Sequence, residues 1–157
     1  MLLSKTISQY IGANLATYIT FLILAIFIVF FLFWIFKQAK DKRFKIIFLV
    51  FIISFLGLSL FPYGLFNDTI SSIHQIFADT TFISSLLTGI ILFARNRKPS
   101  QAIFILYSII FIFAYIFKIA PFRATELVWE TLYFILFLSA LLSNCLKRTQ
   151  LTKNGDF

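Results

Sequence analysis

The feature that most constrains this chain is an apolar run from position 14 to 36 that contains no charged residue. A helix needs about 20 such residues to cross a bilayer, and the run is too long for the hydrophobic part of a signal peptide. Further apolar runs follow, and with 61% hydrophobic and 13% charged residues the chain cannot cover the surface of a soluble domain. We therefore predict an all-α, polytopic integral membrane protein.

The apolar runs predict a single transmembrane domain over residues 1–157, built as a bundle of five transmembrane helices. The expected spans cover about 14–36, 46–61, 73–94, 102–120 and 125–146. Short polar segments separate them, and Pro62 and Pro99 are expected to stop helices.

The cations indicate how the bundle is oriented. Of the 14 lysines and arginines, five lie in segment 37–45, three in 95–98 and three after position 146. The remaining three, Lys5, Lys118 and Arg123, fall at the opposite ends of the spans. The positive-inside rule then places the N-terminus outside and the C-terminus inside a bacterial-type plasma (inner) membrane. The net charge of +8 is explained by topology, so nucleic acid is not expected as a partner.

The expected third span, 73–94, carries a polar stripe. At 100° per residue one face collects His74, Thr81, Ser85 and Thr88, with Gly89 beside them. Lipid cannot satisfy these groups, so we expect this face to point into the bundle and this span to be the least lipid-exposed helix. Gln75 and Asp79 lie one turn apart on its flank.

The fifth span has a matching face, made of Glu126, Glu130, Tyr133, Phe137, Ala140 and Asn144. The ionisable groups near membrane depth all fall in the expected outer half: Asp68, His74, Asp79, Lys118, Arg123, Glu126 and Glu130. An unpaired charge inside a span costs about 3 kcal/mol. These residues are candidates either for structural ion pairs or for an outward-facing polar pocket.

In the pocket hypothesis, His74 and Asp79 point inward to a site shared with Glu130. Lys118 or Arg123 would neutralise part of its charge. Such a site suits a cation, an amine or a proton as ligand.

Known catalytic patterns do not occur in the chain. It has no GxSxG, HExxH, GxxxxGK[ST] or CxxC motif, one histidine and one cysteine, Cys145. We therefore expect no metal site and no cofactor. The sequence favours a non-enzymatic membrane protein that binds a small ligand, a lipid headgroup or a partner subunit, or that forms a homo-oligomer. The alternatives are a small transporter or proton-linked permease, and an extracytoplasmic membrane enzyme using His74 and the carboxylates.

The segment that contains Gly57, Phe61, Pro62 and His74 resembles a prokaryotic multispan membrane family known only as domain of unknown function 998. In that pattern a span ends in Gly-x-x-Phe-Pro, a polar outer turn follows, and a histidine opens the next span. The chain differs in having three residues rather than two between Gly57 and Phe61, in having Tyr63-Gly64 where the family usually has an acid, and in having room for five spans rather than six. The resemblance implies a membrane fold and no particular activity.

Overall fold

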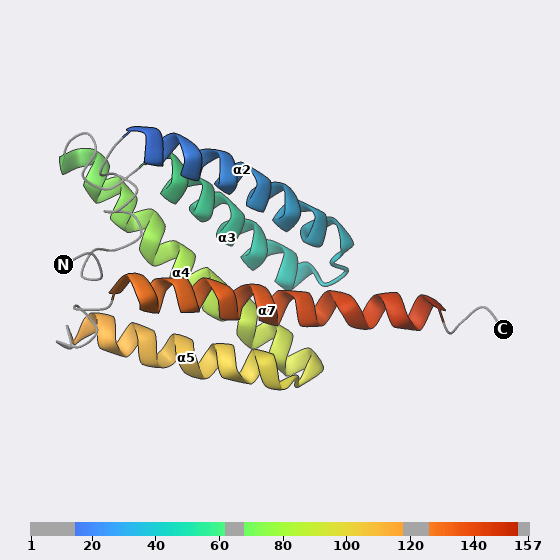
Figure 1. Cartoon of the computed structure of the whole chain (residues 1–157). Helices are drawn as coiled ribbons and strands as arrows, with labels where there is room; N and C mark the ends of the chain where they lie inside the picture. Colours follow the sequence, from blue (N-terminus) through green and yellow to red (C-terminus); the bar gives the residue numbers. More distant parts are fainter. Residues whose placement is uncertain (1–14, 62–67, 118–125, 154–157) are drawn as a thin grey trace.

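The computed structural model describes residues 15–61, 68–117 and 126–153, and this part of the chain is helical throughout apart from short turns (Figure 1). Its five helices are α2 (Leu15–Gln38), α3 (Lys42–Leu60), α4 (Asp68–Asn96), α5 (Pro99–Ile116) and α7 (Glu126–Lys153). Helices α2 to α5 are each long and apolar enough to cross a membrane, whereas the apolar part of α7 spans Val128–Ser143. The chain is thus a membrane-embedded, multi-pass helical protein.

Helix α4 connects two antiparallel helix pairs. Figure 1 shows α2 beside α3, α5 beside α7, and α4 crossing from the first pair to the second. It packs on α3, α5 and α7, while α2 packs mainly on α3. The turns at 39–41 and 97–98 lie at one end of the bundle, here called the cationic end. The opposite end, where α3 finishes and α4 begins, is called the far end.

Three helices begin earlier than the apolar runs predicted. The Asp41 carboxylate accepts hydrogen bonds from the backbone nitrogens of Arg43 (2.8 Å) and Phe44 (3.2 Å), so α3 starts at Lys42. Pro99 does not merely stop α4, because it occupies the first turn of α5, where its fixed φ suits a helix. The expected spans started late because they were placed by hydrophobicity, whereas polar residues extend these helices.

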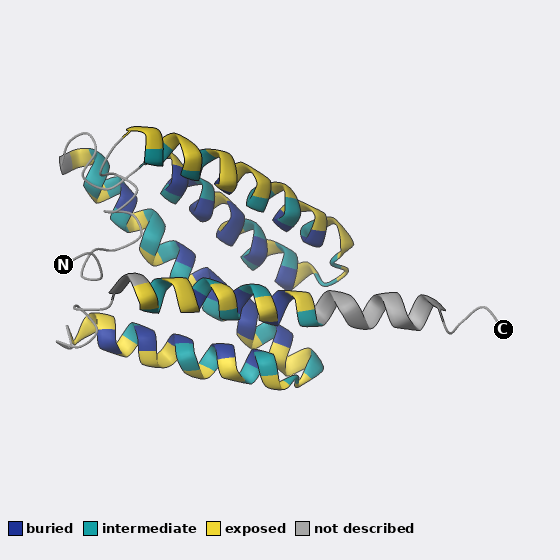
Figure 2. Ribbon diagram, in the orientation of Figure 1, coloured by how far each residue is buried: buried dark blue, intermediate teal, exposed yellow. Residues whose placement is uncertain are grey.

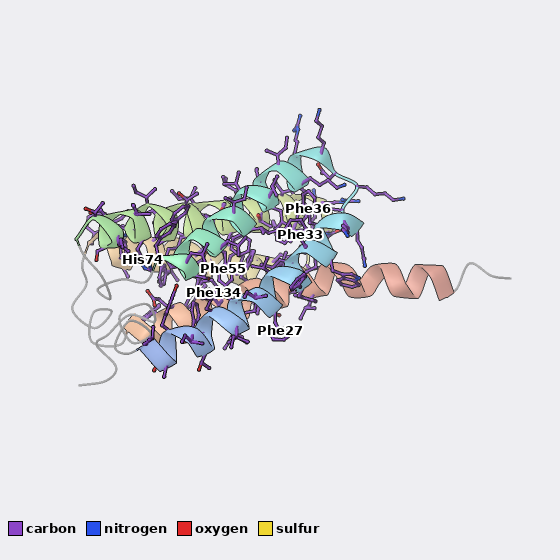
Figure 3. All side chains as sticks on the ribbon, turned by 90° about the horizontal axis from the view of Figure 1, so that it is seen from above. Phe27, Phe33, Phe36, Phe55, His74 and Phe134 are labelled. Carbon is purple, nitrogen blue, oxygen red and sulfur yellow. The ribbon has the colours of Figure 1, made fainter. Side chains whose placement is uncertain are left out.

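A column of phenylalanines on α3 fills the core. Phe44, Phe48, Phe51 and Phe55 are buried, and consecutive ring centroids lie 5.0, 5.9 and 6.1 Å apart. The Phe55 ring also meets Phe134 of α7 at 6.1 Å, and the two labels lie together in Figure 3. By contrast Phe27 of α2 is exposed on the outer side of the bundle. The same residue type therefore serves both the core and the membrane-facing surface.

The prediction that the third span is the least exposed helix is wrong. Within the most apolar 18-residue stretch of each helix, 44% of the stretch is buried in α3, 33% in α4 and 17% in α2. Figure 2 shows the difference between α2 and α3 clearly. The physical reason is position: α3 lies between α2 and α4, whereas α4 keeps one side exposed, including Ile76 and Ile83.

Two glycines let α4 approach its neighbours closely. A Cβ added to Gly57 of α3 would lie 2.4 Å from the Phe77 ring of α4. A Cβ added to Gly89 of α4 would lie 2.6 Å from the Phe104 ring of α5. Each glycine thus provides the space in which a ring from the adjacent helix sits. These two contacts hold α4 to α3 towards the far end and to α5 towards the cationic end.

Candidate functional site

The polar stripe of α4 is buried, as predicted, but most of it is satisfied within the helix. Thr81 and Thr88 are fully buried, and their hydroxyls donate to the carbonyls of Phe77 (2.7 Å) and Ser84 (2.8 Å). Serine and threonine commonly bond the carbonyl one turn back in this way. These hydroxyls therefore need neither a ligand nor a second helix to be stable in the bilayer.

Among the three hydroxyl groups of the stripe, that of Ser85 also bonds to another helix. The Ser85 hydroxyl lies 2.6 Å from the hydroxyl of Tyr133 on α7, and the Tyr133 hydroxyl donates to the carbonyl of Phe82 at 3.1 Å. Tyr133 is 0% exposed, and its ring meets those of Phe104 and Phe111 at 5.3 and 5.1 Å. The matching of the two predicted faces is confirmed here, where α4, α5 and α7 meet.

His74 closes the junction between α3 and α4. Its ring is only 4% exposed, and Nδ1 lies 2.5 Å from the carbonyl oxygen of Phe61, at the end of α3 (Figure 3). With the proton on Nδ1, the ring donates to this carbonyl, which the helix itself cannot satisfy. The Phe61 ring stacks on Phe77 at 5.7 Å, next to Gly57. Gly57, Phe61 and His74, which carry the family resemblance, thus converge at one contact, while Pro62 lies outside the described residues.

Asp79 does not point into the bundle, so that part of the pocket hypothesis is wrong. The side chain is exposed, because it lies about 140° around α4 from His74. Gln75 Nε2 donates to Asp79 Oδ1 at 2.8 Å and to the hydroxyl of Tyr115 on α5 at 2.6 Å. We call Gln75, Asp79 and Tyr115 the Asp79 network. The sequence placed Gln75 and Asp79 one turn apart on the flank of the stripe, but neither their hydrogen bond nor its extension to α5 was predicted.

The remaining candidates are only partly described. Lys118 and Arg123 lie in segment 118–125, outside the described residues. Asp68 and Glu126 are the first residues of α4 and α7, and their side chains also fall outside the described part. Glu130 is half-buried in the second turn of α7. A pocket that combines Glu130 with His74 therefore stays a prediction.

A polar contact at the cationic end was missed by sequence reasoning. Lys98 Nζ donates to the backbone carbonyl of Ser143 on α7, and Ser100 Oγ donates to Ser143 Oγ at 3.0 Å. Beside them Gln101 is 0% exposed, and its Nε2 has no hydrogen-bond partner. The signal in the sequence was the run of polar residues around Pro99, which we interpreted as the end of a helix. These bonds join α5 to α7.

Comparison with models of known families, with curated proteins and with solved structures finds no match to this chain. Among the residues that the structure describes, no three His, Cys, Asp or Glu side chains come together to hold a metal ion. The resemblance carried by Gly57, Phe61 and His74 therefore stays a prediction, and function has to be argued from the geometry.

Proposed function

We propose that this chain is a non-enzymatic subunit of a larger assembly in the plasma membrane, and that it binds a partner membrane protein through the surface around Asp79. One observation carries the proposal: a carboxylate lies exposed on a helix that is apolar enough to cross the membrane. A charge facing lipid costs about 3 kcal/mol, and a partner that pairs with it removes that cost.

The contacts of the inward-facing side chains favour this function over a pocket for a small ligand. His74 bonds to the Phe61 carbonyl and Ser85 to Tyr133, so both are used in holding helices together. A transporter typically has a broken helix at its binding site, whereas α4 runs without a break from Asp68 to Asn96. The proposed binding site remains in the far half of the bundle, where it was expected from the sequence. It is an exposed surface and not an enclosed pocket.

Assembly in the native membrane tests this function. Tagged wild-type chain, solubilised in a mild detergent and run on a native gel, should migrate as a complex larger than the single chain. Asp79→Leu should migrate as the single chain, because it removes the proposed contact and leaves the buried side chains unchanged. Wild-type chain that migrates alone would contradict the proposed function.

We also propose five spans with the N-terminus outside and the C-terminus inside. Segments 37–45 and 95–98, which hold eight of the 14 cations, include the two turns at the cationic end, and this supports the orientation. Reporter fusions at Asn67 and Arg123 should read outside, and fusions at Lys42, Asn96 and Asn154 should read inside. A cytoplasmic signal at Asn67 would overturn this orientation.

A further inference from the structure

Counting residues along α4 from its cationic end, we place the Asp79 carboxylate inside the hydrocarbon. Arg95, exposed in the last turn of α4, marks the boundary at the cationic end. A hydrocarbon thickness of about 30 Å corresponds to about 20 helical residues, which places the other boundary near Gln75. Tyr115, bonded to Gln75, is the kind of aromatic residue that lies at such a boundary. Asp79 is one turn deeper, about 6 Å inside.

The surface around Asp79 has the form of a helix-packing site. Ile76, Ile83 and Ile90 are exposed on the same side of α4, spaced so that they form one row with Asp79. A second transmembrane helix lying along this row would pack on the isoleucines and bring one of its residues to the carboxylate.

The Asp79 network offers two acceptors to such a helix. Gln75 makes both of its hydrogen bonds through Nε2, and Asp79 uses Oδ1. Within the described ranges, Oδ2 of Asp79 and Oε1 of Gln75 accept no hydrogen bond. A carboxylate oxygen beside an amide oxygen suits a donor with positive charge, that is an ammonium or a guanidinium group.

The described cations cannot supply that charge. They lie in segments 37–45, 95–98 and 147–153, towards the cationic end, and Asp79 lies in the far half of the bundle. A second copy of the chain that met this one through the same face would bring carboxylate to carboxylate.

We infer that the Asp79 network receives a transmembrane helix of a different protein, and that this helix carries a lysine or arginine about one turn inside the far-end boundary. The inference rests on the proposed function and specifies the chemistry of the partner. The cation pairs with Asp79, Gln75 Oε1 accepts a further hydrogen bond, and the isoleucine row supplies the apolar contact.

The test uses the full-length chain in phosphatidylcholine vesicles with synthetic single-span peptides, and association is measured by energy transfer between fluorescent labels. The peptides are leucine-alanine helices with lysine, arginine, glutamine or leucine one turn inside the far-end boundary, and one with lysine near the cationic end. The first two should bind the wild-type chain about tenfold more tightly than the leucine peptide. The misplaced lysine should give no gain.

Two variants make the test specific. Asp79→Asn should lower binding of the lysine peptide to the level of the leucine peptide, with the melting temperature unchanged because the side chain is exposed. Asp41→Asn is the matched control, since it removes a carboxylate at the cationic end while asparagine still caps α3. It should bind as the wild-type chain does.

Equal binding of lysine and leucine peptides, or unchanged binding by Asp79→Asn, would overturn the inference. The inference would also be overturned if the wild-type chain associated with itself without peptide and Asp79→Asn did not. The surface would then bind a second copy of the chain. If the native complex depends on Asp79 but the vesicles show no preference for lysine, the inference fails and the proposed function stands. If the wild-type chain is alone in native membranes, the proposed function fails.

Discussion

Tyr133→Ala should lower the free energy of unfolding by about 3–5 kcal/mol, the usual cost of removing a buried aromatic ring. Tyr133 is fully buried where α4, α5 and α7 meet, and its ring contacts Phe82, Phe104 and Phe111. The cavity would remove contacts from all three helices at once. Unfolding in mixed micelles, followed by the fluorescence of Trp34 on α2 and Trp129 on α7, gives the measurement.

Tyr133→Phe measures the contribution of the hydroxyl to stability apart from that of the ring. It keeps the aromatic contacts and removes the hydrogen bonds to Ser85 and the Phe82 carbonyl, so a loss of about 1 kcal/mol is expected. Ser85 retains its own bond to the Phe82 carbonyl at 2.9 Å, which limits the cost. If Tyr133→Ala were no more harmful than Tyr133→Phe, the ring would not be the centre of helix packing.

Gly57→Leu should cost about 1–3 kcal/mol or more, because it places a side chain where the Phe77 ring lies. Even a Cβ at this position comes within 2.6 Å of Phe77 Cγ, close to the backbone of α4, so a rotation of the ring cannot relieve the contact. The stacked ring of Phe61, only 4° from parallel, further restricts Phe77. The same unfolding experiment should show α3 and α4 separating more easily.

Two comparisons test the cause of that loss. Gly57→Leu combined with Phe77→Ala should be less harmful than the sum of the two single changes, because the second change removes the ring that clashes. Leu24→Phe, on the exposed side of α2, should change stability by no more than about 0.5 kcal/mol. Additive effects of Gly57→Leu and Phe77→Ala would contradict a direct contact between the two residues.

The apolar runs were sufficient to predict the helices, because a chain that crosses a bilayer has to satisfy its backbone hydrogen bonds within itself. The helical periodicity was sufficient to predict the polar stripe of α4. Neither pattern could predict which helix is most buried. Phe27 and Phe51 are equally apolar, and nothing in their local sequence shows that one is exposed and the other packs on Phe137. In a membrane both environments are apolar, so hydrophobicity does not separate the core from the lipid-facing surface.

The error at Asp79 has a different origin. The angular position of the residue, on the flank of the stripe, was correct, but which flank is covered depends on how α4 crosses its neighbours. That crossing is fixed by contacts between distant residues, such as Phe77 with Gly57 and Phe104 with Gly89. The bond between Gln75 and Tyr115, 40 residues apart, has the same origin. Local periodicity contains no information about such pairs.

The place of α4 between the two helix pairs has a consequence for biosynthesis. Its contacts with α3 can form as soon as it is made, but Tyr133, the partner of Ser85, is 48 residues further along the chain. At a synthesis rate of about 5–20 residues per second, the newly inserted α4 waits roughly 2–10 s for that partner. During this time the Ser85 hydroxyl can stay bonded to the Phe82 carbonyl of its own helix. Because the hydroxyls of the stripe bond to carbonyls of their own helix, α4 can be surrounded by lipid before α7 is made and packs against it.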